Sequence, residues 1–187
     1  MEYSYIQKLY YDNIYNIKNI EENIQMIIYA VIGFFLPFIL GHPQILVGTI
    51  VNAMLILGAT YLRGYKILPI ILLPSIGVMS AGVIFGTYTI YLLYLIPLIW
   101  LGNTLYVYVY KHINMKNKTI MNGLIGVGVA SVMKAALLFG ATFTLVYFSV
   151  LPTIFLTAMG ILQITTAILG GIVAVGIIRV RERMVQN

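Results

Sequence analysis

Six apolar segments make up most of the chain, and short polar or glycine- and proline-containing connections separate them. They cover residues 24–40, 45–62, 67–85, 88–110, 123–148 and 154–178. A helix needs about 20 mostly apolar residues to cross the hydrocarbon core of a bilayer. The pattern therefore predicts an all-α fold, a polytopic membrane protein with six transmembrane helices in one bundle.

Composition supports this fold class and limits the domain organisation. Of the 187 residues, 61% are hydrophobic and 9% are charged, whereas about 25% of the residues of a soluble domain are charged. A chain of this length that forms such a bundle has no room for a second folded domain. We therefore expect an N-terminal interfacial arm at 1–23, a transmembrane domain at 24–178 and a basic cytoplasmic tail at 179–187.

The N-terminal arm carries aromatic and apolar residues at helical spacing. Ile6, Tyr10, Ile14 and Ile17 fall on one row of a helix. This row predicts an aromatic-rich helix that lies in the membrane interface before the first span. The alternative is a loosely ordered arm.

The basic residues of the connections and the tail fall on one side of a six-span chain. They are Arg63, Lys66, Lys111, Lys116, Lys118, Arg179, Arg181 and Arg183. The opposite connections hold no lysine or arginine, and their only titratable residue is His42. Because basic loops stay in the cytoplasm, we expect a multi-pass protein of the cell (plasma) membrane with both termini cytoplasmic. Five or seven spans would scatter these charges over both sides.

Lys134 lies near the middle of the fifth apolar segment, where a charge is costly. Insertion scales put the cost at about 2.5–3.5 kcal/mol. No acidic residue occurs between Glu22 and Glu182, so no neighbouring span supplies a carboxylate. Lys134 must therefore reach the surface, lose its proton, bond to carbonyls and amides, or meet an anionic group from outside the chain. Reaching the surface is difficult, because the lysine is about 16 Å from the inner end of its span at 1.5 Å per residue.

Other polar side chains lie in or beside the spans. Asn52, Asn103 and Gln163 lie at roughly central depth, and His42 and Gln44 lie at the outer mouth. One interpretation is hydrogen bonding across the bundle, at about 0.6 kcal/mol per bond. The occurrence of these amides in different spans, together with an unpaired lysine, favours a shared polar pocket. The substrate-binding candidates are Gln44, Asn52, Asn103, Lys134, Gln163 and His42.

Several chemistries have no residues to support them. The chain has no cysteine and no H-E-x-x-H motif, so we expect no metal site and no cofactor. It has no G-x-x-x-x-G-K-[ST] loop, so it does not hydrolyse nucleotides itself. We expect no enzymatic activity. The net charge of +6 fits membrane topology and lipid contact rather than nucleic-acid binding.

Four motifs together resemble a known group of proteins. The runs are HPQILVGTIVNAMLIL at 42–57, IPLIWLGNTLYVYVY at 96–110, the Met133-Lys134 pair, and MGILQITTAILGGIVA at 159–174. They look like a group of small six-helix membrane proteins often labelled iron-hydrogenase-associated. The chain also resembles the S components, the substrate-binding membrane subunits of energy-coupling factor transporters. It departs from them in the short loop at 41–44 and in lacking their A-x-x-x-A pattern in the first span.

The resemblance implies a function and partners. S components bind a small solute near the outer face, and an energising ATPase and a transmembrane coupling module drive transport. It implies that this chain binds a small polar or anionic solute from the outer side of the lipid bilayer. The alternative is a non-transporting membrane anchor or assembly subunit of a complex, for example a redox complex.

Overall fold

The computed structural model describes residues 5–15, 17–116 and 118–186, and these form an all-α bundle with no strand. The first helices are α1 (Tyr5–Tyr11), α2 (Asn19–Leu40), α3 (Gln44–Tyr61), η1 (Gly64–Ile67) and α4 (Leu68–Ala81). The remaining helices are η2 (Gly86–Tyr91), α5 (Leu92–Lys116), α6 (Ile120–Tyr147), α7 (Ile154–Met159) and α8 (Ile161–Gln186). Within the described ranges, six helical stretches are long and apolar enough to cross a membrane. The predicted fold class is confirmed.

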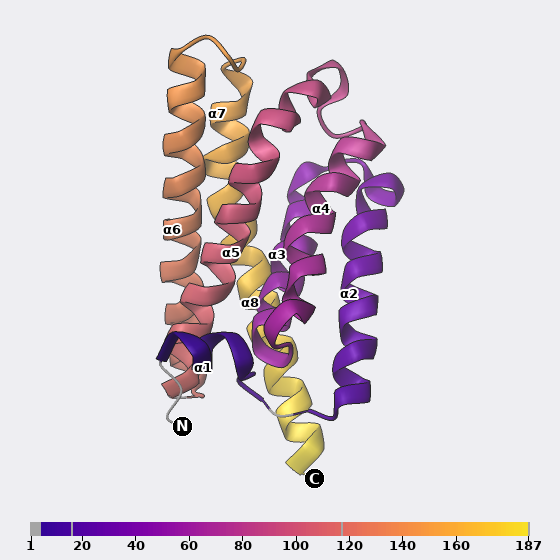
Figure 1. Cartoon of the computed structure of the whole chain (residues 1–187), viewed down its shortest axis with the longest axis vertical. Coiled ribbons are helices and arrows are strands. Elements are labelled where there is room, and N and C mark those ends of the chain that lie inside the picture. Colours follow the sequence, from indigo (N-terminus) through magenta and orange to yellow (C-terminus); the bar gives the residue numbers. More distant parts are fainter. Residues whose placement is uncertain (1–4, 16, 117, 187) are drawn as a thin grey trace.

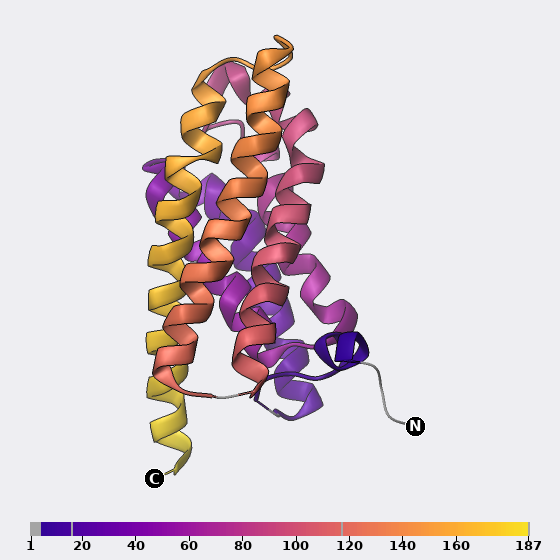
Figure 2. The ribbon, with the colours of Figure 1, turned by 90° about the vertical axis from the view of Figure 1, so that its left-hand side faces the viewer.

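The long helices run side by side, and both ends of the chain lie at the same end of the bundle (Figures 1 and 2). The most extensive pairings are α3 with α8, α5 with α6 and α2 with α4. Helix α3 is the most deeply buried of the spanning helices, and α2 lies at the edge. We call the end with the termini the basic end, because it carries Arg63, Lys66, Lys111, Lys118, Arg179, Arg181 and Arg183. The opposite end carries the connections 41–43, 82–85 and 148–153.

Glycines allow the closest helix contacts. A Cβ atom added at Gly170 in α8 would clash with the backbone carbonyl of Thr49 in α3. One added at Gly77 in α4 would clash with the carbonyl of Phe34 in α2. Small residues are expected where helix backbones approach this closely in a membrane. Gly170 and Gly77 therefore serve helix packing inside the bundle.

We expect Gly170→Ala to lower the free energy of unfolding by about 1–3 kcal/mol, because the added methyl group forces α3 and α8 apart. The matched control is Gly140→Ala in α6, where an added Cβ meets no atom within 4 Å. That variant should be neutral or slightly stabilising, since alanine favours a helix by up to about 1 kcal/mol over glycine. Thermal unfolding in detergent measures both variants. Equal stabilities of the two variants would contradict this packing.

Three of the spans are interrupted. The third and fourth begin with the 3-10 turns η1 and η2, and the α-helices that follow contain Pro74 and Pro97. The sixth breaks at Gly160, between α7 and α8. A Cβ atom at Gly160 would lie 2.7 Å from the carbonyl oxygen of Leu156 and 2.9 Å from the Phe139 ring. The break was not predicted, because the apolar run there continues without a proline.

The helix expected in the N-terminal arm as far as Ile17 ends at Tyr11, the last residue of α1. Beyond it the chain crosses the basic end, where the backbone N–H groups of Ile14 and Tyr15 donate to the carbonyl of Thr60 at 3.0 and 3.2 Å. Ile14 is buried in the core of the bundle. The arm therefore packs against the protein, because main-chain donors and one apolar side chain find partners at the end of α3.

Both outer boundaries predicted for the transmembrane domain differ from the structure. Helix α2 begins at Asn19 rather than Ile24, and α8 continues through the predicted tail as far as Gln186. Ion pairs hold both extensions. The carboxylate of Glu21 accepts from Arg181, and that of Glu182 accepts from Arg179. The Glu21–Arg181 pair joins the start of α2 to the end of α8, and the Glu182–Arg179 pair lies within α8.

Candidate functional site

A cavity of about 100 Å³ lies in the half of the bundle away from the basic end. It reaches from Gln44 and Phe85, near the opposite end, to Lys134 at the middle of α6. Helices α3 to α8 and the segment 84–85 contribute its walls. Its polar lining residues are Gln44, Asn52, Ser75, Asn103, Lys134, Gln163 and Thr166.

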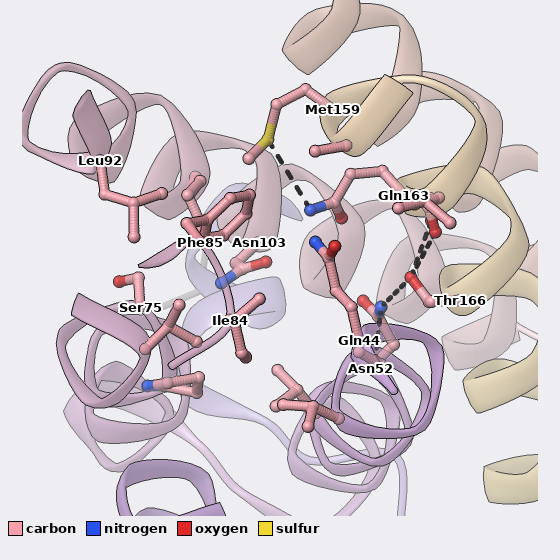
Figure 3. A pocket seen from close by; sticks show the side chains of 18 of the residues that line it. Gln44, Asn52, Ser75, Ile84, Phe85, Leu92, Asn103, Met159, Gln163 and Thr166 are labelled. Atoms are coloured by element: carbon pink, nitrogen blue, oxygen red, sulfur yellow. Dashed lines mark hydrogen bonds between the residues drawn. The ribbon is translucent and has the colours of Figure 1, made fainter. Parts of the chain in front are cut away.

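The structure brings together five of the six sequence-predicted candidates. Gln44, Asn52, Asn103, Lys134 and Gln163 all line the cavity. His42 does not line it, and its side chain is exposed in the connection between α2 and α3. The residues converge because α3 packs against α5 and α8, and α6 packs against the same two helices. Figure 3 shows Gln44, Asn52, Asn103 and Gln163 around the cavity.

Lys134 is almost completely buried, with 2% of its surface exposed. Its Nζ donates to Oδ1 of Asn52 at 2.7 Å. It also lies 5.2 Å from the centre of the Tyr106 ring, within the range in which an aromatic face attracts a cation. Of the alternatives left open by the sequence, the structure therefore favours bonding to an amide over reaching the surface.

Asn52 is held so that its oxygen faces the lysine. Its Nδ2 donates to the carbonyl of Gly48 at 2.9 Å and to Oγ1 of Thr166 at 3.2 Å. Thr166 in turn donates to the carbonyl of Leu162 at 2.8 Å. The amide thus uses both of its N–H groups within α3 and α8, which leaves Oδ1 for Lys134. Figure 3 shows this chain of bonds from Asn52 through Thr166 into α8.

Asn103 and Trp100 on α5 bond to backbone carbonyls of the kinked helix α4. Nδ2 of Asn103 donates to the carbonyl of Ile71 at 3.0 Å. Nε1 of Trp100 lies 3.2 Å from the carbonyl oxygen of Leu72 and 2.8 Å from Oγ of Ser75. Backbone carbonyls near a proline kink need such partners, because lipid supplies none. Asn103 therefore has a structural bond as well as a place at the cavity.

Gln44 and Gln163 are held more loosely. The one hydrogen bond described for the Gln163 side chain joins Nε2 to the sulfur of Met159 at 3.9 Å, and sulfur is a weak acceptor. No side-chain hydrogen bond of Gln44 is described. Figure 3 shows the two amide groups pointing toward each other between α3 and α8. They can therefore turn toward a solute at little cost.

Two polar lining residues, Thr166 and Ser75, were not among the candidates. Thr166 follows Gln163 at helical spacing, so the run Q-x-x-T was a signal that could have identified it. Ser75 follows Pro74, and a hydroxyl beside a proline kink is ordinary in a membrane helix. Neither could be assigned to a cavity without the positions of α3 and α5.

Comparisons with protein-family models, with curated proteins and with solved structures find no match for this chain. The chemistry of the cavity has to be inferred from its own residues. Within the described part of the chain its lining contains one lysine and no acidic residue. A cavity of this kind can bind a group that accepts hydrogen bonds and carries negative charge.

Proposed function

We propose that this chain is the substrate-binding membrane subunit of a small-solute transporter, similar to the S components, and that the solute is polar or anionic. The observation that carries the proposal is Lys134, a buried cation that lines a cavity and has a neutral amide as its partner. Intramembrane ionisable residues usually belong to substrate or ion pathways. A purely structural lysine would not need a cavity beside it.

The orientation of the cavity supports uptake from outside. It lies away from the basic end, and basic residues mark the cytoplasmic side. With both termini in the cytoplasm of a plasma-membrane protein, the solute enters from the outer side. Because the sequence has no nucleotide-binding loop, energy would come from a partner, an ATPase with its membrane coupling module.

The test is untargeted mass spectrometry of what is released when the purified protein is denatured. We expect one small solute to be enriched from the wild type and lost from Lys134→Met, which removes the charge and keeps a side chain of similar length. The matched control is Lys8→Met, which removes the same charge from an exposed position in α1. The control should retain the solute. A folded Lys134→Met protein that still carries it would contradict the proposal, and protein partners without any solute would favour the anchor alternative.

Single cysteines test the orientation, and the chain has none of its own. Thr87→Cys and Ser149→Cys, at exposed positions of the opposite end, should react with an impermeant maleimide added to intact cells. Tyr65→Cys and Met184→Cys, which replace side chains 67% exposed at the basic end, should react only after the cells are opened. Labelling of the second pair in intact cells would contradict the proposed topology.

A further inference from the structure

We infer that the solute is a small monoanion with an apolar end, comparable in size to propionate, rather than a zwitterion, a dianion or a vitamin-sized molecule. This inference rests on the proposed function and adds the substrate class. Three properties of the cavity carry it: its charge, the distribution of its polar groups and its volume.

The charge of the cavity selects a single negative group. Within the described chain, Lys134 is the one charged residue in the lining. Its Nζ has three N–H groups as an ammonium, and the structure describes one acceptor for them, Oδ1 of Asn52. Two donors are left for the oxygens of a carboxylate. A second negative group would be buried without a cation, and an ammonium group would meet Lys134 with no carboxylate to offset it.

The polar and apolar sides of the cavity select an amphipathic solute. Lys134, Asn52 and Thr166 form one connected polar group against α8. The remaining wall, from α4, α5 and the 84–85 segment, is mostly apolar and includes Val78, Phe85, Leu92 and Ile99. Its two polar residues, Ser75 and Asn103, already donate to the α4 carbonyls of Leu72 and Ile71. Figure 3 places Leu92 and Phe85 on the side away from Thr166. A carboxylate at Lys134 would therefore leave the rest of the solute against a mostly apolar wall.

The volume of the cavity limits the number of atoms in the solute. This volume, about 100 Å³, is smaller than the roughly 150 Å³ of an apolar cavity that holds benzene. The cavity therefore accepts a solute somewhat smaller than benzene. Drug-sized ligands occupy about 300–1,000 Å³.

The experiment compares four probes on the full chain in nanodiscs of phosphatidylcholine: propionate, propionamide, alanine and succinate. Trp100 is the only tryptophan, and its indole is bonded to Ser75 in the cavity wall. Its fluorescence therefore reports filling of the cavity, and calorimetry gives the dissociation constants independently. Propionate should bind saturably, and each other probe should bind at least tenfold more weakly. Lys134→Met should lose propionate binding, and Lys8→Met should retain it.

The outcomes separate the two proposals. Binding of propionamide, alanine or succinate as tight as that of propionate would overturn the monoanion and leave solute binding intact. A co-purified solute that carries no net negative charge, or two negative charges, would likewise overturn the monoanion and leave solute binding intact. If no probe binds and no solute co-purifies, both proposals fail. The comparison of propionate with propionamide uses the wild type alone, so it decides the question even if Lys134→Met does not fold.

Discussion

Asn52→Leu is expected to lower the free energy of unfolding by about 3 kcal/mol or more, the loss typical of a buried charge deprived of its partner. Asn52 is 2% exposed and supplies the hydrogen-bond acceptor for Lys134, which is equally buried. Leucine has similar bulk and no acceptor. It would leave the lysine facing an apolar surface, with the ring of Tyr106 as its remaining described contact.

Removing the charge of Lys134 should restore most of the free energy of unfolding that Asn52→Leu loses. Lys134→Met alone should be nearly neutral, and the double variant Asn52→Leu/Lys134→Met should be more stable than Asn52→Leu. The matched control is Thr166→Val, which removes one acceptor of the Asn52 amide and leaves the lysine bond in place; we expect a loss of about 1 kcal/mol or less. Thermal unfolding in detergent measures the stabilities of the wild type, the two single variants and the double variant, which together form a double-mutant cycle. Additive effects of the Asn52 and Lys134 substitutions would contradict the coupling.

The sequence predicted the spans because hydropathy is a local property of the chain. Each apolar run is bounded by polar residues or by glycine and proline, and each becomes a helical stretch able to cross a membrane. The same reasoning could place Lys134 and Asn52 at central depth. It could not pair them, because they lie on α6 and α3 and meet only through the packing of the bundle.

The basic end was predicted least well. Lys111 was assigned to a polar connection, but α5 continues to Lys116 and Lys111 is fully buried. Its Nζ has no hydrogen-bond partner within the described residues. Glu22 was placed in an interfacial arm, and it too is fully buried. The arm and the ends of the helices cover one another there, and such long-range packing leaves no periodic signal in the sequence.

Substitution of Glu22 is expected to have the second large effect on the free energy of unfolding. Its Oε1 accepts the backbone N–H of Arg63 at 2.9 Å. Its Oε2 accepts from Nζ of Lys66 at 2.7 Å and from Nε of Arg63 at 3.3 Å. One buried carboxylate therefore fixes the loop between α3 and α4 to the start of α2. Glu22→Gln should lower the free energy of unfolding by about 3 kcal/mol, since it leaves both cations without their counter-charge.

The neighbouring carboxylate is the control. Glu21→Gln makes the same chemical change in a side chain that is 45% exposed and pairs with Arg181. A pair exposed to this degree contributes about 1 kcal/mol or less and weakens as salt is added. Thermal unfolding at low and high salt compares the two variants, and trypsin cleavage after Arg63 and Lys66 measures release of the loop. Glu22→Gln should be destabilised at both salt concentrations and cleaved faster. If Glu21→Gln were equally destabilised or cleaved, burial of Glu22 would not be what fixes the loop.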